Sequence, residues 1–182
     1  PFTMEMAPDG SAVFFESDQQ LGTLRDLYRY DIASGAIDRV TTGTPLISDP
    51  GFELVRAARS QGVTVTTAPG ACAVTAALSI SGLPTDRFVF EGFLPSRQGH
   101  RQRELERLRR EARTLVFYES PRRITATLED MASVFGSQRA AVVVRELTKT
   151  YESVYAAPLG ELADQAGQGE ITEKGEFVVL VE

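Results

Sequence analysis

The stretch TLVFYESPRRITATLEDMASVF, residues 114–135, decides the fold class because a strand pattern passes directly into a helix pattern. Residues 114–118 form a short run of threonine, leucine, valine and aromatic side chains, which is typical of a β-strand. Ser120 and Pro121 then make a favourable helix start. Apolar residues recur at helical spacing beyond it, at Ile124, Leu128, Met131 and Phe135. A strand joined to a helix in this way indicates an α/β protein.

The same alternation continues on both sides of this stretch. Upstream, residues 88–90 are predicted as a strand, and an arginine- and glutamate-rich helix follows with a narrow apolar stripe at Leu105, Leu108 and Ala112. Downstream, three further strands are predicted at residues 140–144, 152–156 and 177–181. We therefore expect a mixed sheet with covering helices in the C-terminal part of the chain.

Residues 42–84 are also predicted to alternate between strand and helix. Asp49 can cap a helix that Gly62 ends, and residues 63–67 are predicted as a strand. Residues 71–80 are nearly all apolar and are predicted as a helix. A helix that is apolar on every side is expected to be buried.

The first forty-one residues differ from the rest and are predicted to be rich in β-structure. A turn signal at residues 8–10 precedes a strand at residues 12–15, and residues 27–32 and 37–40 have the pattern of a hairpin. Residues 1–41 resemble a single blade of TolB-like propellers, although no second copy of the pattern occurs. The alternative is a short β-rich segment with no relation to propellers.

Composition excludes several classes of protein. The 182 residues, of which 42% are hydrophobic and 24% charged, suit a soluble globular protein with one full domain and a fragment, or with two small domains. No run of about 18 apolar residues and no basic, apolar leader is found, so nothing points out of the cytoplasm or to a membrane. Cys72 and His100 are the single cysteine and histidine, which excludes an internal disulfide and a Cys/His zinc site.

The charge distribution allows a local basic patch on an acidic protein. The net charge of -6 argues against a protein whose whole surface binds nucleic acid. Residues 96–113 nevertheless hold seven arginines against three glutamates. Arg97, Arg101 and Arg103 precede or open the predicted helix, where they can project toward RNA phosphates. The alternative is a solvated face with pairs such as Glu106 and Arg110.

Six blocks of sequence carry a family resemblance. In order they are GTPLISDPG (43–51), APGACA (68–73), GLPTDRFVFEGFLPSR (82–97), TLVFYESPRR (114–123), VVVRELTKTYE (142–152) and KGEFVVLVE (174–182). Together they resemble the ribosomal RNA small-subunit methyltransferase I family of the tetrapyrrole methylase superfamily, over residues 42–182. The resemblance implies methyl transfer from S-adenosylmethionine to a ribose 2′-hydroxyl of a cytidine in 16S ribosomal RNA, within the small ribosomal subunit.

The resemblance also implies site residues. The cofactor is expected between two α/β domains, against Gly43, Thr44, Pro45, Ile47, Ala71, Cys72, Tyr118 and Glu119. RNA contacts are expected from Arg97, Arg101, Arg103, Arg122 and Arg123. For several of these a plain structural role is the alternative: Tyr118 as a strand-end aromatic, Glu119 as a solvated charge, and Arg122 and Arg123 as first-turn helix residues. Glu119 and Glu146 are conceivable general bases, and that role stays open, as does a homodimer.

The chain departs from the family pattern before Thr42. The usual SDA triplet and the blocks before it are replaced by the β-rich segment. We therefore expect a β-rich segment at residues 1–41, a truncated Rossmann-like methylase domain at 42–84 and a mixed-sheet α/β domain at 85–182. A second hypothesis follows from this departure: a truncated or chimeric, non-catalytic remnant that binds RNA or protein.

Overall fold

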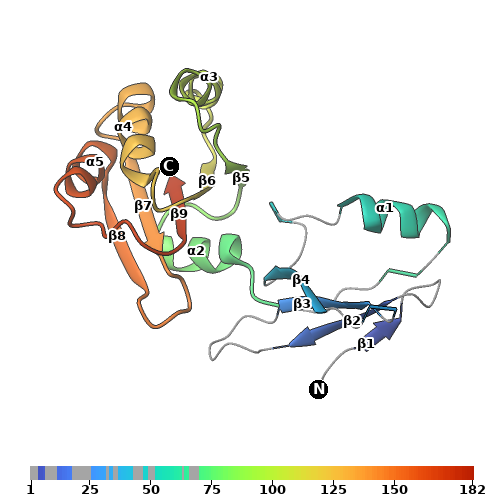
Figure 1. The fold of residues 1–182 in the computed structure, drawn as a ribbon. Helices are drawn as coiled ribbons and strands as arrows, with labels where there is room; N and C mark the ends of the chain where they lie inside the picture. The colour runs from blue at the N-terminus through green and yellow to red at the C-terminus, as the bar shows by residue number, and fades with distance from the viewer. Residues whose placement is uncertain are drawn as a thin grey trace. The chain divides into compact units, whose positions relative to one another are not determined.

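A computed structural model describes residues 4–6, 12–17, 26–31, 33–34, 37–42, 47–48, 52–62, 64–65 and 70–182 of the chain (Figure 1). The chain packs as two compact units, Pro1–Cys72 and Ala73–Glu182. The division into three parts with a boundary at residues 84 and 85 stays a prediction.

The first unit contains a four-stranded antiparallel sheet. Its strands lie in chain order: β1 (Met4–Met6), β2 (Ala12–Ser17), β3 (Asp26–Asp31) and β4 (Ile37–Thr42). The pairing of Tyr30 with Ile37 confirms the predicted hairpin, and β1 is a strand that the sequence analysis did not predict. This up-and-down order is also the strand arrangement of one propeller blade.

Helix α1 (Phe52–Ser60) confirms the helix predicted after Asp49, which itself lies outside the described residues. The strand predicted at residues 63–67 is not formed at Thr64 and Val65, the two positions of that range that the structure describes. None of the described strands pairs with these two residues, and without a neighbouring strand their backbone groups have no ladder to join.

The second unit is a five-stranded mixed sheet with four helices. Its elements are α2 (Ala73–Ser81), β5 (Phe88–Phe93), α3 (Gln98–Leu108), β6 (Thr114–Glu119), α4 (Ile124–Phe135), β7 (Ala140–Arg145), β8 (Ser153–Pro158), α5 (Leu159–Gly167) and β9 (Phe177–Val181). The strand order is β5-β6-β9-β7-β8, with β5 parallel to β6 and the other pairs antiparallel. The predicted mixed α/β sheet is therefore confirmed.

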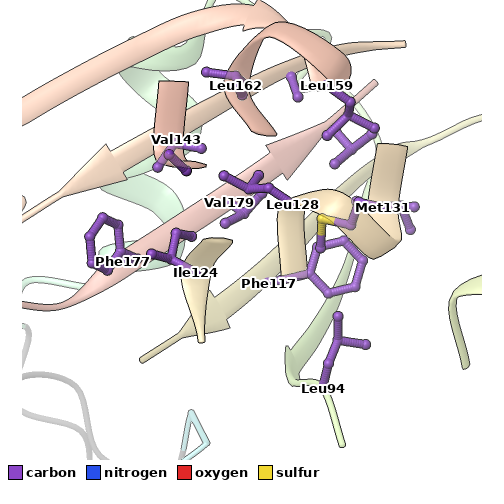
Figure 2. Packing of buried hydrophobic residues seen from close by; sticks show 14 of the residues in the cluster. Leu94, Phe117, Ile124, Leu128, Met131, Val143, Leu159, Leu162, Phe177 and Val179 are labelled. Carbon is purple, nitrogen blue, oxygen red and sulfur yellow. The ribbon is translucent and has the colours of Figure 1, made fainter. Parts of the chain in front are cut away.

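The core of this unit lies between the sheet and helices α3, α4 and α5. Strand β9 is central and all five of its residues are buried, as expected for a strand covered on both faces. In β6, Leu115 and Phe117 face the helices, where Phe117 and Met131 of α4 point toward one another (Figure 2). Leu128 and Leu162 bring α4 and α5 into the same cluster.

Helix α2 covers the other face of the sheet and packs on β9. It buries Val74, Ala77, Leu78 and Ser81, whose spacing defines one helix face. The expectation that this helix is buried on every side is wrong, because Ile80 on its outer side is 45% exposed. A single packing surface requires only one apolar face.

Two further elements differ from the sequence analysis. Helix α5 was not predicted, although Pro158 precedes it and Leu159 and Leu162 have helical spacing. Helix α3 ends at Leu108, so Ala112 lies beyond it and does not continue the predicted apolar stripe.

Candidate functional site

Strand register brings four of the sequence blocks to one edge of the sheet. Phe93 at the end of β5 pairs with Tyr118 in β6. Glu119 at the end of β6 pairs with Phe177 at the start of β9, and Phe177 pairs with Arg145 at the end of β7. We call this the motif edge; it consists of residues 92–97, 118–123, 145–149 and 174–177. Convergence of polar loops at the carboxyl ends of strands is common for ligand sites in α/β proteins.

The Glu119 carboxylate is buried within this edge and fully engaged. The residue is 2% exposed. Its Oε1 accepts a hydrogen bond from the Ser120 backbone N–H at 2.7 Å, and its Oε2 accepts one from Thr127 Oγ1 at 2.7 Å. Arg123 Nη2 lies 3.2 Å from Oε2. The alternative of a solvated charge is therefore wrong, and the carboxylate has internal partners where a general base needs access to substrate.

Arg123 ties two blocks of the motif edge together. Its Nη2 donates to the carbonyl oxygens of Leu94 at 2.6 Å and Pro95 at 3.2 Å, besides its ion pair with Glu119. The Nε atom of Arg123 is buried and has no hydrogen-bond partner among the described residues. The guanidinium is thus held by the protein, and the side chain is 25% exposed.

The RELTK turn at residues 145–149 is held against the turn that precedes β9. Glu146 and Thr148 adopt left-handed backbone conformations, with φ of 51° and 65°, which are uncommon for residues other than glycine. Glu146 Oε1 accepts from the Glu176 backbone N–H at 2.8 Å and from Lys149 Nζ at 3.1 Å. Local strain of this kind persists where surrounding contacts determine it, often at functional sites.

The charges of this turn reinforce one another. Burial opposes ionisation of Glu146, but the Glu176 N–H and the Lys149 ammonium outweigh it, so the pKa of Glu146 is lowered from its ordinary value. Burial likewise opposes the charge of Lys149, but hydrogen bonds to Glu176 and Glu146 raise its pKa. A carboxylate with a lowered pKa is a weaker proton acceptor, which makes Glu146 a poor general base.

Aromatic side chains form the remaining surface of the motif edge. The ring of Tyr118 packs edge-on against Phe90 and Phe93, with centroid separations of 4.9 and 5.6 Å. Phe93 is 54% exposed. Phe93 was not singled out from the sequence, although it stands in the quoted block at residues 82–97. A partly exposed aromatic pair can pack against a flat ring of a ligand.

The structure corrects the expectation that Arg101 projects to solvent. Arg101 is 4% exposed, and its Nη2 lies 2.6 Å from Oδ2 of Asp130, which is 3% exposed. Gln98 and Gln102 donate to Oδ1 of the same aspartate at 3.1 and 2.8 Å. This polar network joins α3 to α4. The sequence offered one signal for it, since Asp130 falls beside Met131 within the apolar periodicity of α4.

Three more arginines of residues 96–113 pair locally. Arg107 pairs with Glu104 and Arg113 with Glu111. The hydrogen bond from Arg113 lowers the pKa of Glu111 to about 2. Glu106 pairs with Arg109 at 3.2 Å, three residues away, and not with Arg110 as considered from the sequence. Within the described part of the chain, three exposed arginines of residues 96–113 take part in no ion pair, Arg97, Arg103 and Arg110, and the same holds for the exposed Arg122.

The residues expected to hold the cofactor fall in both units. Gly43, Thr44 and Pro45 lie outside the described residues. In the first unit, Ile47 is 39% exposed, Ala71 is exposed and Cys72 is half-buried. Tyr118 and Glu119 belong to the second unit. Within the second unit, the partly exposed aromatic pair of Phe93 and Tyr118 can pack against a flat ring of a ligand, whereas both oxygens of the Glu119 carboxylate are engaged by the protein.

The described residues contain neither a cluster of metal ligands nor a helix that could span a membrane. No group of three or more histidine, cysteine, aspartate or glutamate residues among them could hold a metal ion. Of the helices that the structure describes, none is long and apolar enough to cross a membrane.

Comparison of the sequence with known proteins gives consistent similarities. A model of the tetrapyrrole (corrin/porphyrin) methylases matches residues 25–163. A protein of Pseudomonas aeruginosa named ribosomal RNA small subunit methyltransferase I is 52% identical over 139 residues, 76% of this chain and 49% of the relative. Proteins of the same name from Xylella fastidiosa strain Temecula1 and Escherichia coli O157:H7 are 55% and 49% identical over 140 residues, 77% of this chain. The chain spans about half the length of these relatives.

Solved structures share the fold at lower identity. Cobalt precorrin-4 methyltransferase covers 76% of this chain and 60% of its own, with a TM-score of 0.56 and 18% identity. A uroporphyrin-III C-methyltransferase from Thermus thermophilus, in complex with S-adenosylhomocysteine, covers 77% and 63%, with a TM-score of 0.53 and 24% identity. The predicted methylase fold is confirmed by these similarities.

Proposed function

The chain belongs to the tetrapyrrole (corrin/porphyrin) methylase family, and from this premise we propose that it transfers a methyl group from S-adenosylmethionine to the ribose 2′-hydroxyl of a cytidine in 16S ribosomal RNA. The observation that carries the proposal is the identity of about one half with relatives named ribosomal RNA small subunit methyltransferase I. Three of the four segments of the motif edge, residues 92–97, 118–123 and 145–149, lie within residues 25–163 that the methylase model matches, which supports the same reaction.

S-adenosylmethionine supplies an electrophilic methyl group when it is bound. We propose that Gly43, Thr44, Pro45, Ile47, Ala71, Cys72 and Tyr118 hold it, with Glu119 contributing through its position at the end of β6. The reaction requires the ribose oxygen to be aligned with the methyl group, so positioning supplies most of the rate. No side chain is assigned as general base, because the carboxylates of Glu119 and Glu146 are both engaged in the fold.

The proposed RNA surface differs from the five arginines expected at first. Arg97, Arg103 and Arg122 remain in it because they are exposed and unpaired within the described chain. Arg101 and Arg123 leave it because their guanidinium groups are held by Asp130 and by the motif edge. The small ribosomal subunit as target and a homodimer stay predictions.

The test is isothermal titration of the chain with S-adenosylmethionine, followed by a methyl-transfer assay on small ribosomal subunits that lack the modification. Phe93→Ala removes aromatic surface at the motif edge, and Phe88→Ala removes a similarly exposed ring at the other end of β5. We expect roughly threefold to tenfold weaker cofactor binding for the first variant, the effect of losing one aromatic contact, and none for the second. A chain that binds no cofactor would refute the proposal.

A further inference from the structure

A shallow groove runs between α3 and α4 on the outer side of the second unit. It has a volume of about 400 Å³, and it is lined by Gly99, Gln102, Arg103, Glu106, Arg109, Ser133 and Val134. The first four residues follow one face of α3 at helical spacing, Arg109 comes directly after this helix, and the last two lie near the end of α4. This groove is separate from the aromatic surface at the motif edge.

The α3 wall of the groove begins at Gly99, two residues after the motif-edge segment 92–97. Strands β5 and β6 both end at the motif edge, and α3 and α4 begin directly after them. Arg97 precedes α3 and stands near this end of the groove, whereas Arg122 precedes α4, whose lining residues Ser133 and Val134 lie in its last turn. An extended ligand that leaves the motif edge can therefore follow α3.

The unpaired arginines are spaced along the same path. Of the seven arginines in residues 96–113, four pair with carboxylates inside the unit, and Arg97, Arg103 and Arg110 do not. At 1.5 Å per helical residue, Arg103 lies about 9 Å along the axis from Arg97 and about 10 Å from Arg110. Arg103 and Arg110, seven residues apart, point in nearly the same helical direction, and two unpaired cations on one side suit a chain of phosphates better than a single anion.

The lining of the groove favours the backbone of a nucleic acid over its bases. Arg103, Gln102 and Ser133 offer guanidinium, amide and hydroxyl groups, the donors that commonly contact phosphate and sugar oxygens. The one carboxylate, Glu106, is paired with Arg109. No aromatic residue is among those that line the groove, so stacking on bases has no platform here.

The groove is also pre-formed. The buried ion pair of Arg101 and Asp130 fixes α3 on α4, and Gln102, a lining residue, donates to the same Asp130. A wall that is already ordered loses little conformational entropy when a ligand binds.

We propose that this groove is a track for the sugar–phosphate backbone of RNA, in which Arg103 makes the central phosphate contact between Arg97 and Arg110. The inference rests on the proposed function, since it extends the path of the substrate RNA away from the motif edge. Arg101, which the sequence grouped with these cations, supports the groove from within and touches no RNA.

The test is binding of a labelled single-stranded RNA of mixed sequence to the full chain, followed by fluorescence anisotropy at several potassium chloride concentrations. Loss of one phosphate contact lowers the salt slope by ~0.7, which corresponds to about fivefold weaker binding at ~0.1 M salt. We expect this change for Arg103→Ala. Arg107→Ala is the matched control, because Arg107 is exposed on the same helix and paired with Glu104; its effect should stay below about twofold.

A second pair of variants tests the α4 wall. Ser133→Glu places a carboxylate in the groove, whereas Gln138→Glu adds the same charge in the exposed turn after α4. Repulsion of phosphates should weaken RNA binding at least about fivefold for the first variant and below about twofold for the second. Equal effects within either pair of variants would overturn the groove as the binding path.

Further outcomes distinguish failure of the groove proposal from failure of the proposed reaction. A wild-type chain that binds no RNA overturns the inference. Displacement of the labelled RNA by polyglutamate as readily as by unlabelled RNA also overturns it, since that result points to an acidic protein partner. Titration with S-adenosylmethionine is run on the same variants. Intact cofactor binding with no effect of Arg103→Ala refutes the groove alone, whereas absent cofactor binding with the expected variant effects refutes the reaction alone.

Discussion

The side chain of Glu146 fills the space in which a side chain on Gly175 would stand. A Cβ atom on Gly175 would overlap Cγ, Cδ and Oε1 of Glu146, and Gly175 has a φ of +87°. Glu146 in turn accepts the backbone N–H of Glu176. The RELTK turn and the turn before β9 are therefore assembled as one unit, each shaped by the other.

Gly175→Ala is expected to destabilise the protein by roughly 2 kcal/mol or more, because the left-handed backbone and the overlap both disfavour alanine. The measurement is urea unfolding followed by circular dichroism. Gly167→Ala at the end of α5 is the control, since its φ is not positive and nothing lies within 4 Å of the added carbon. Equal stability of Gly175→Ala and wild type would show that the turn rearranges without cost.

Acid should weaken the same turn. The pKa of Glu146 in the folded protein is lowered below the ordinary value of 4.5. The ionised carboxylate therefore stabilises the fold fully above pH 4.5, and this stabilisation is lost as the pH falls through the pKa of the folded protein. Glu146→Gln removes the titration. The difference in unfolding free energy between wild type and Glu146→Gln should be largest near neutral pH and should shrink below pH 4.5. A difference that is constant with pH would contradict the assignment.

Breaking the buried pair between α3 and α4 is expected to be costly. Arg101→Met leaves Asp130 buried without its cation, which should destabilise the protein by about 3–5 kcal/mol. Replacing both residues, as Arg101→Met with Asp130→Leu, should recover most of that loss because no charge is left unpaired. The exposed control Arg107→Ala should change stability by less than about 1 kcal/mol. A double variant that is as unstable as the single one would argue that the pair itself is favourable.

Limited proteolysis should yield a protected fragment that begins near Ala73 and not near residue 85. The reason is that α2 buries Val74, Ala77 and Leu78 and packs on β9. The mass of the protected fragment, measured by mass spectrometry, identifies its first residue. Val74→Asp should shift the cut toward residue 85 by releasing the helix, while Ile80→Asp on its exposed side should leave the fragment unchanged.

Local pattern was enough to predict most elements of the second unit. Strands β6 and β9 and helix α4 were predicted because their side chains show the period of the element and clear end signals stand beside them. Helix α5 was missed, since Gly160 and Gly167 weaken its helical pattern.

The candidate site was predicted less well, because its chemistry depends on contacts between distant residues. The sequence shows seven similar arginines, and only the fold shows that Arg101 meets Asp130, 29 residues later. Glu119 is a comparable case. It was weighed as a solvated charge or a cofactor contact, yet its partners Thr127 and Arg123 enclose it in the structure.

The position of Glu119 also has a consequence for how the molecule opens. The residue ends β6, and its carboxylate accepts from Ser120 and from Thr127 in α4. If the start of α4 unfolded alone, the buried carboxylate of Glu119 would lose its partners Thr127 and Arg123. The end of β6 and the start of α4 should therefore open together, in a single concerted event. In hydrogen exchange, the amides of Ser120 and Thr127 should then report the same opening rate, and Thr127→Val should accelerate both together.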